Sequence, residues 1–216
     1  MRPLPLLNRR PVTDRKEHRL TVITRDVSNE ELLLQLKAGD QSVFDEVVAR
    51  FKNQLMNLVL RYLGNREDAE DVVQEAMVRV YINIHRYDAS YKATTWIYTI
   101  TLNLARSVWQ KKHRWVVLGS SLMREDDQSD YFDQIADVSL SPDYISDATS
   151  QTDIIERALA SINPVFREAV ILRDMEGCTY EEIAAIMNLN LGTVKSKINR
   201  GRVMLKHFIR QEMDRR

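Results

Sequence analysis

The sequence predicts an all-α protein of two small helical domains joined by a flexible acidic linker. Its apolar residues recur at three- and four-residue intervals, which is typical of amphipathic helices, and no alternating strand pattern competes with them. A chain of 216 residues is long enough for two small domains. Between them, residues 116–150 lose the helical period and are rich in serine and aspartate, which favours a linker.

The first two predicted helices have clear local boundaries. Ser28 and Glu31 have the spacing of a capping box, which predicts a helix from there to about Lys37. A longer helix begins near Val43, where apolar residues again take up the helical spacing, and Gly64 and Asn65 end it. Both helices therefore follow from the sequence around their ends.

Two more helices complete the N-terminal half. The third is predicted from Asn65 to Ile84, since its apolar residues keep the three-four spacing throughout. They are Ala69, Val72, Val73, Ala76, Met77, Val80, Tyr81 and Ile84. A loop over about 86–93 leads to a fourth helix, from Thr94 to about His113.

The C-terminal half begins with helix signals near Thr152. Asn163 and Pro164 then open another helix, with a capping residue followed by proline in the first turn. Thr179 and Glu182 form a second capping box, which starts a short helix.

A tight turn over 188–190 separates that short helix from a longer one. The apolar stripe predicted along the longer helix comprises Leu191, Val194, Ile198, Gly201 and Leu205. A supporting helix, a three-residue turn and a second helix make a helix-turn-helix. The domains predicted are a disordered leader (1–26), a first helical domain (27–115), the acidic linker (116–150) and the helix-turn-helix domain (151–216).

The outer face of the last helix is polar and basic, although the chain as a whole is neutral, with 31 basic and 31 acidic residues. This face carries Gly192, Thr193, Ser196, Asn199 and Arg200, flanked by Lys195, Lys197 and Arg202. Hydroxyl, amide and guanidinium groups can bond base edges and phosphates in a major groove. The alternative is a solvated basic helix without a ligand, but the caps and the turn spacing favour DNA binding.

Three runs in this half carry a family resemblance. They are Tyr180-Glu181-Glu182-Ile183-Ala184, Gly192-Thr193-Val194-Lys195-Ser196-Lys197 and Arg200-Gly201-Arg202. They resemble region 4 of the extracytoplasmic-function (ECF) sigma factors, the module that binds the minus-thirty-five promoter element. The resemblance implies that the minus-thirty-five contacts are Thr179, Tyr180, Thr193, Lys195, Ser196, Lys197, Asn199 and Arg200. The family usually has alanine in place of Gly201, so we expect this glycine to weaken the helix by up to about 1 kcal/mol.

The third predicted helix has an acidic outer face. Clustered carboxylates could suggest a metal site, but these point away from the core and lack the histidines that helical carboxylate sites use. From the residues alone a solvated face is the simpler interpretation. However, the run from Asp68 to Ala76 is similar to region 2.2 of the same sigma family, which docks on core RNA polymerase. That similarity implies a docking surface of Asp68, Glu70, Asp71, Gln74 and Glu75.

The fourth predicted helix carries a narrow polar seam of Thr99, Asn103, Arg106 and Gln110 between two apolar stripes. Aromatic and basic residues flank the seam, among them Tyr87, Tyr91 and Lys92 before it and Trp115 after it. Such groups suit single-stranded DNA, whose bases stack on rings and whose phosphates need cations. The alternative for Tyr98 and Trp109 is a place in the core. The run from Thr94 to Ile100, with Asn103, resembles sigma regions 2.3 and 2.4, which implies minus-ten recognition and strand separation. The residues implied are Lys92, Thr94, Thr95, Trp96, Thr99, Asn103 and Arg106.

Several classes of function are not supported by the sequence. We find no catalytic residues, no metal ligands and no cofactor site, because the four histidines are scattered and Cys178 is a lone cysteine. No apolar run is long enough for membrane insertion, and a single cysteine fits a cytoplasmic protein. The expected partners are core RNA polymerase and promoter DNA, with no small-molecule substrate, and the resemblance adds an anti-sigma factor that can hold such proteins inactive.

Two other hypotheses remain open at this point. A conventional helix-turn-helix regulator would bind duplex DNA without core polymerase and would not need the acidic face. A helical scaffold would bind only proteins, and its activity would survive substitution of Arg200.

Overall fold

The computed structural model of the protein describes residues 27–120 and 151–214, with side chains described over 27–113 and 154–214. Every regular element in these ranges is a helix, which confirms the predicted fold class. The predicted leader and most of the predicted linker lie outside the described residues.

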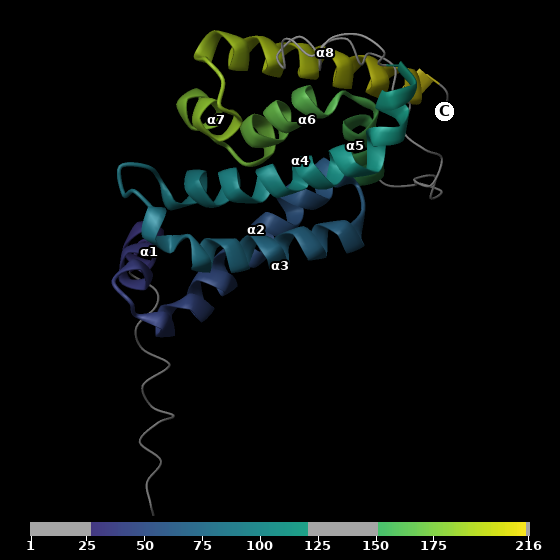
Figure 1. Ribbon diagram of the computed structural model, residues 1–216. Helices are drawn as coiled ribbons and strands as arrows, with labels where there is room; N and C mark the ends of the chain where they lie inside the picture. Colours follow the sequence, from purple (N-terminus) through teal and green to yellow (C-terminus); the bar gives the residue numbers. More distant parts are fainter. Residues whose placement is uncertain (1–26, 121–150, 215–216) are drawn as a thin grey trace, which may run out of the picture.

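The two halves of the chain each contribute a series of helices (Figure 1). The N-terminal half comprises α1 (Asn29–Lys37), η2 (Gln41–Val43), α2 (Phe44–Leu63), α3 (Arg66–Ile82), η3 (Ile84–Arg86) and α4 (Ala93–Ser120). The C-terminal half comprises α5 (Gln151–Ser161), α6 (Pro164–Val170), the π-helical turn η5 (Ile171–Met175), α7 (Tyr180–Met187) and α8 (Leu191–Asp214).

The helix boundaries follow the local signals in the sequence. In α1, the backbone N–H of Glu31 donates to Ser28 Oγ at 3.1 Å, and that of Ser28 donates to Glu31 Oε2 at 2.9 Å. The second capping box, between Thr179 and Glu182, begins α7 in the same way. Gly64 ends α2 in the left-handed conformation, with a φ of 75° that glycine adopts without strain.

Two elements differ from the sequence prediction. Helix α4 continues to Ser120, beyond the predicted end near His113 and into the segment assigned to the linker. The π-turn η5 was not expected, and it is closed by a hydrogen bond of 3.0 Å from the N–H of Glu176 to the carbonyl of Ile171. This five-residue hydrogen-bond spacing has no simple signature in apolar periodicity.

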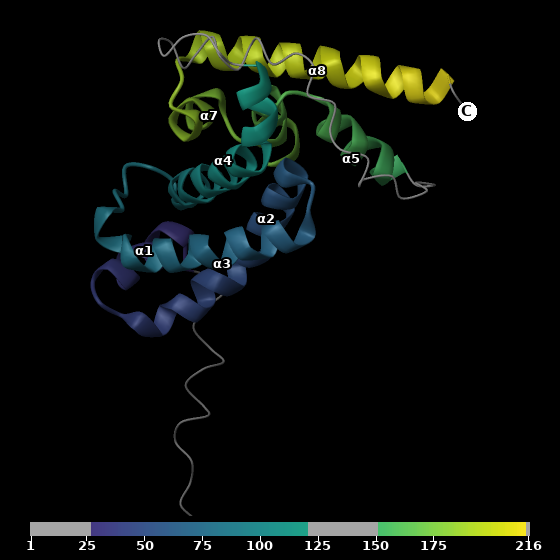
Figure 2. The ribbon, with the colours of Figure 1, turned by 45° about the vertical axis from the view of Figure 1, so that its right-hand side comes forward.

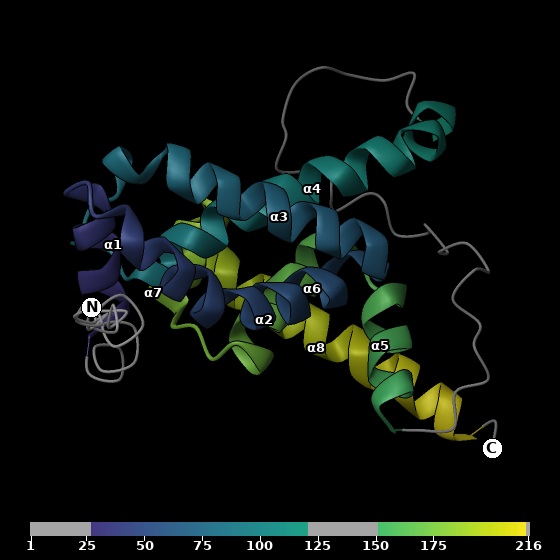
Figure 3. The same cartoon turned by 90° about the horizontal axis from the view of Figure 1, so that it is seen from below.

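The helices form stacked layers in which α4 lies in the middle. Figures 1 and 2 show α2 and α3 on one side of α4, and α6 and α7 on the other, with α8 outermost. Seen from below in Figure 3, α3 lies along α4, while α8 lies behind α2 and α6. The C-terminal half is thus folded back along the fourth helix of the N-terminal half.

The hydrophobic core runs through both halves without a break. Fully buried side chains such as Leu55 and Leu102 in the N-terminal half belong to the same cluster as Leu172, Ile183 and Val194 in the C-terminal half. Tyr98 and Trp109 are 1% and 5% exposed, so the alternative that placed these aromatics in the core is the one observed. Tyr87, expected among the aromatic groups before α4, is also fully buried.

Candidate nucleic-acid and polymerase interfaces

The acidic face of α3 points away from the core. Asn65 caps the helix, its Oδ1 accepting from the N–H of Asp68 at 2.9 Å. The residues expected to dock on polymerase that are exposed are Glu70, Asp71, Gln74 and Glu75. Two of these carboxylates pair along the helix, Glu70 with Arg66 at 2.9 Å and Glu75 with Arg79 at 2.7 Å. Exposed pairs of this type contribute little to stability and leave the face available to a partner.

Asp68 differs from the other acids of this face. Its carboxylate is largely covered and forms an ion pair with Lys112 of α4. The structure therefore places Asp68 at the edge of the α3 face, where it ties α3 to α4.

The α3 face continues into two apolar residues that the sequence analysis left out. Val78 and Ile82 are 50% and 62% exposed and follow Asp71 and Glu75 along one side of the helix. The sequence does indicate that they share a face with the acids, because positions 71, 75, 78 and 82 are three or four residues apart on one helix. The α3 face thus combines an acidic part with an apolar end.

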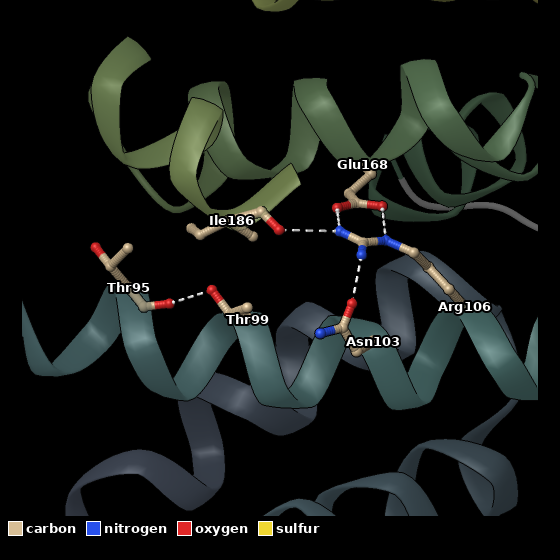
Figure 4. Close-up of polar contacts among 6 residues, drawn as sticks. All are labelled: Thr95, Thr99, Asn103, Arg106, Glu168 and Ile186. Atoms are coloured by element: carbon tan, nitrogen blue, oxygen red, sulfur yellow. Dashed lines mark hydrogen bonds and ion pairs between the residues drawn. The ribbon is translucent and has the colours of Figure 1, made fainter. Parts of the chain in front are cut away.

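The polar seam of α4 faces the C-terminal half, as Figure 4 shows. Arg106 donates from Nε and Nη2 to the two carboxylate oxygens of Glu168 on α6, at 2.9 and 2.5 Å. It also donates to the carbonyl of Ile186 on α7 at 3.3 Å and to Asn103 Oδ1 at 2.6 Å. Burial acts to lower the pKa of Arg106, but the hydrogen bonds and charge of Glu168 outweigh it and raise that pKa.

The threonines in the first turns of α4 are covered to different degrees. Thr95 is buried, with 6% of its surface exposed, and Thr99 is half-buried with its hydroxyl donating to the Thr95 carbonyl at 2.8 Å. Thr94 and Trp96 are half-buried as well, whereas Asn103 is exposed. The seven residues expected at the minus-ten element thus do not form one open surface in this arrangement.

Lys92, just before α4, also binds a carboxylate of the C-terminal half. Its Nζ lies 2.7 Å from Glu182 Oε1, at the start of α7. The hydrogen bond to Glu182 raises the pKa of Lys92. Burial acts to raise the pKa of Glu182, but hydrogen bonds from Lys92 and from the Thr179 backbone hold it below its ordinary value.

Glu176 adds a third contact of this kind between the halves. It accepts a hydrogen bond of 2.6 Å from the hydroxyl of Tyr98 and pairs with Arg61 of α2 at 3.2 Å. Its side chain is only 6% exposed, so this contact is largely removed from water.

A buried arginine also joins the halves. Arg167 on α6 donates to the carbonyl of Tyr62 near the end of α2 at 2.5 Å, and to the carbonyls of Ala160 and Ile162. It is 2% exposed, and burial lowers its pKa to about 10. Its bonds to backbone carbonyls satisfy groups that a helix end leaves without intrahelical partners.

The helix-turn-helix has the predicted geometry. Asn188 adopts a left-handed conformation with a φ of 53° at the end of α7, and Asn190 Oδ1 accepts from the N–H of Thr193 at 2.8 Å. The exposed residues among those expected to bind the minus-thirty-five element are Thr179, Lys195, Ser196, Asn199 and Arg200. Tyr180 and Thr193 are half-buried.

Two cations lie over the ring of Tyr180. The guanidinium carbon of Arg173 is 4.7 Å from the ring centroid, and Lys195 Nζ is 5.6 Å from it. Tyr180 thus helps to position Lys195 at the exposed face of α8.

Two residues of α8 do not lie where the sequence analysis placed them. Lys197, expected at the exposed flank, is only 8% exposed, and its Nζ lies 5.4 Å from the ring centroid of Phe166. A long aliphatic stem allows lysine to cover an aromatic ring in this way. Leu191, expected on the inner stripe, is 41% exposed at the first position of the helix.

Within the described residues, no group of histidine, cysteine, aspartate or glutamate side chains could hold a metal ion. In the same part of the chain, no helix is long and apolar enough to cross a membrane.

Comparison with known proteins identifies both halves. The family model of Sigma-70 region 2 matches residues 47–115, and that of Sigma-70 region 4 matches residues 152–205. The chain is 32% identical to the ECF RNA polymerase sigma factor SigW of Bacillus subtilis over 176 residues, which cover 82% of this chain and 94% of that protein. It is 33% identical to the ECF sigma factor SigE of Mycolicibacterium smegmatis, covering 79% of this chain and 64% of that one.

Solved structures share the fold. CnrH in complex with the cytosolic domain of CnrY has a TM-score of 0.60 at 19% identity, over 85% of this chain and 97% of that one. The sigma factor RpoE of Bartonella quintana, in complex with the anti-sigma factor NepR, has a TM-score of 0.58 at 23% identity, over 77% and 96% of the two chains.

Proposed function

This chain belongs to the ECF RNA polymerase sigma factors, and we propose which of its surfaces bind core polymerase and which bind promoter DNA during transcription initiation. Members of this family bind core RNA polymerase and direct it to promoters, acting as polymerase subunits rather than as catalysts. The observation that carries the proposal is that one chain holds an exposed acidic α3 face and an exposed helix-turn-helix. A conventional regulator has no need of the α3 face, and the match to region 2 favours the sigma factor over it.

We assign core-polymerase docking to the α3 face. Glu70, Asp71, Gln74 and Glu75 present carboxylate and amide groups to solvent, and Asp68 supports them from the edge. Buried residues on the other side of α3, such as Ala69 and Val73, hold the helix against the core. Exposed charges on a rigid helix suit a complementary basic partner, because they steer its approach and fix its register.

We assign promoter DNA to α4 and α8. On α8, the exposed Lys195, Ser196, Asn199 and Arg200 can reach phosphates and base edges of a minus-thirty-five duplex, while Thr179 and Tyr180 border that face. To α4 we assign the unpaired minus-ten bases and their phosphates, through Asn103 and Arg106 with Thr94, Thr95, Trp96, Thr99 and the preceding Lys92. Of these residues, Lys92 and Asn103 are exposed in this arrangement. Residues 27–115 and 151–216 would then be the two working domains.

An anti-sigma protein completes the proposed set of partners. It would act by preventing one or more of these surfaces from reaching polymerase or DNA.

In vitro transcription tests the proposal. The purified chain is added to sigma-free core polymerase with a library of promoter fragments. We expect specific transcripts, and we expect their loss in the Asp71→Lys/Glu75→Lys variant. The control reverses two exposed acids outside the α3 face, Asp45→Lys/Asp214→Lys, and should leave transcription intact. Duplex binding without any transcript would favour the conventional regulator instead.

A further inference from the structure

The two cations assigned to minus-ten DNA at either end of the α4 seam are occupied by carboxylates of the C-terminal half. Arg106 binds both oxygens of Glu168, and Lys92 binds Glu182. The carboxylate of Glu168 is only 3% exposed. The contact between Arg106 and Glu168 is therefore formed in a covered interface, whereas Lys92 in the second pair is itself exposed.

A carboxylate presents to arginine much the same pair of oxygens that a phosphate does. The guanidinium group of Arg106 uses two N–H donors on Glu168, in the fork geometry that also suits a DNA phosphate. The same donors cannot serve both acceptors at once. Binding of a DNA strand along α4 must therefore displace Glu168.

The C-terminal half covers more of the α4 surface than its two cations. Arg106 also bonds the carbonyl of Ile186 in α7, and Thr95 is buried. Further contacts hold the halves together away from the DNA cations. These are the bonds of Glu176 to Tyr98 and Arg61, and the bond of Arg167 to the Tyr62 carbonyl. α6 and α7 are thus held over the seam from several directions.

We propose that this folded-back arrangement is a closed state in which α6 and α7 occupy the minus-ten DNA surface of α4, with Glu168 and Glu182 in the place of phosphates. The proposal rests on the assignment of α4 to minus-ten DNA made above. The α3 face stays exposed in the closed state, as do Lys195 and Arg200 on α8. The closed chain can therefore still present its polymerase-docking and duplex-binding surfaces, and the single-strand surface becomes available only when the halves separate.

Binding of single-stranded DNA to the full chain tests this inference. The probe is a fluorescein-labelled random-sequence 12-nucleotide strand, followed by fluorescence anisotropy. All proteins carry Lys195→Ala and Arg200→Ala, so that the exposed α8 cations do not contribute. Because apparent affinity scales with the fraction of competent molecules, we expect Glu168→Gln and Glu176→Gln each to tighten binding by about threefold, and the double variant by about tenfold.

The matched control is Glu181→Gln, which removes the same charge from an exposed position on α7. Its affinity should stay within about twofold of the parent, since surface charges contribute weakly. Glu176 is the informative position, because it contacts Tyr98 and Arg61 and neither of the DNA cations. Tighter binding in Glu176→Gln therefore reports separation of the halves rather than release of one charge.

Small-angle X-ray scattering gives a second readout that does not depend on DNA. Glu168→Gln and Glu176→Gln should increase the radius of gyration, while circular dichroism shows unchanged helix content. If neither variant differs from Glu181→Gln in affinity or size, the closed state is overturned. Tighter binding in Glu168→Gln alone would also overturn it. If the variants expand and bind the strand more tightly but the parent gives no transcripts with core polymerase, the closed state stands and the proposed function fails.

Discussion

A methyl group added at Gly201 would lie 2.6 Å from Cγ2 of Val170 and 3.0 Å from the carbonyl oxygen of Phe166. Helix α8 approaches α6 so closely at this point that a side chain is excluded. The glycine that the sequence analysis regarded as a weakness of α8 is thus required by packing between two helices.

We expect Gly201→Ala to lower the free energy of unfolding by about 1 kcal/mol. Overpacking costs about 2 kcal/mol, the middle of its usual range, and the gain in helix propensity offsets about 1 kcal/mol of this cost. Urea denaturation measures the change. The control is Gly192→Ala, whose new methyl group would make an ordinary contact of 3.5 Å with Asn190 Oδ1. Equal stability of the two variants would contradict the close approach.

The ion pair of Arg106 and Glu168 should show strong energetic coupling. We expect a double-mutant cycle with Arg106→Gln and Glu168→Gln to give a coupling energy of about 2 kcal/mol, as found for neighbours in one network. Urea denaturation of the four proteins provides the cycle. The exposed pair Glu75 and Arg79 gives a control cycle, with about 0.3–0.5 kcal/mol expected. A value for Arg106 and Glu168 no larger than the control would mean that the two halves are not held by this pair.

Lys195 should contribute to duplex binding through a phosphate. We expect Lys195→Ala to weaken binding to minus-thirty-five duplexes of all sequences and to reduce the slope of log affinity against log salt by about 0.9. Anisotropy titrations between low and moderate salt measure this slope. Lys52→Ala removes an exposed lysine of α2 and should leave the slope unchanged. An unchanged slope in Lys195→Ala would show that this lysine does not meet a phosphate.

The thiol of Cys178 should be unreactive near neutral pH. Burial raises its pKa to about 12, and the negative charges of Glu182 and Glu176 act in the same direction. At pH 8 the thiolate population falls by about a thousandfold relative to an ordinary thiol with a pKa near 9. Because the pKa is raised, the rate of reaction with Ellman's reagent should still rise tenfold per pH unit between pH 9 and 10.5. The denatured chain should level off in that range, and a folded chain that also levels off would contradict the raised pKa.

Features set by neighbouring residues could be predicted from the sequence. The capping boxes at Ser28 and Thr179 and the left-handed glycine at position 64 need only a few adjacent residues. The helix-turn-helix was predicted for the same reason, since its caps and turn lie within a short stretch of chain.

Features set by distant residues could not be predicted in this way. The partner of Arg106 lies 62 residues further along the chain, and nothing near Arg106 indicates it. Burial of Lys197 depends on the ring of Phe166, which belongs to another helix. The role of Gly201 depends likewise on how α6 packs against α8. The sequence therefore predicted the surfaces better than the contacts that cover them.

The ion pairs that join the two halves among the described residues are polarised in one direction. In Arg61–Glu176, Lys92–Glu182 and Arg106–Glu168, the N-terminal half supplies the base and the C-terminal half supplies the acid. If Lys92 and Arg106 also bind DNA, a substitution of either residue weakens promoter binding as well as the contact between the halves. No DNA contact is assigned to Glu168 or Glu176. Substitutions of these two residues therefore change how readily the halves separate and leave the DNA-binding residues unchanged.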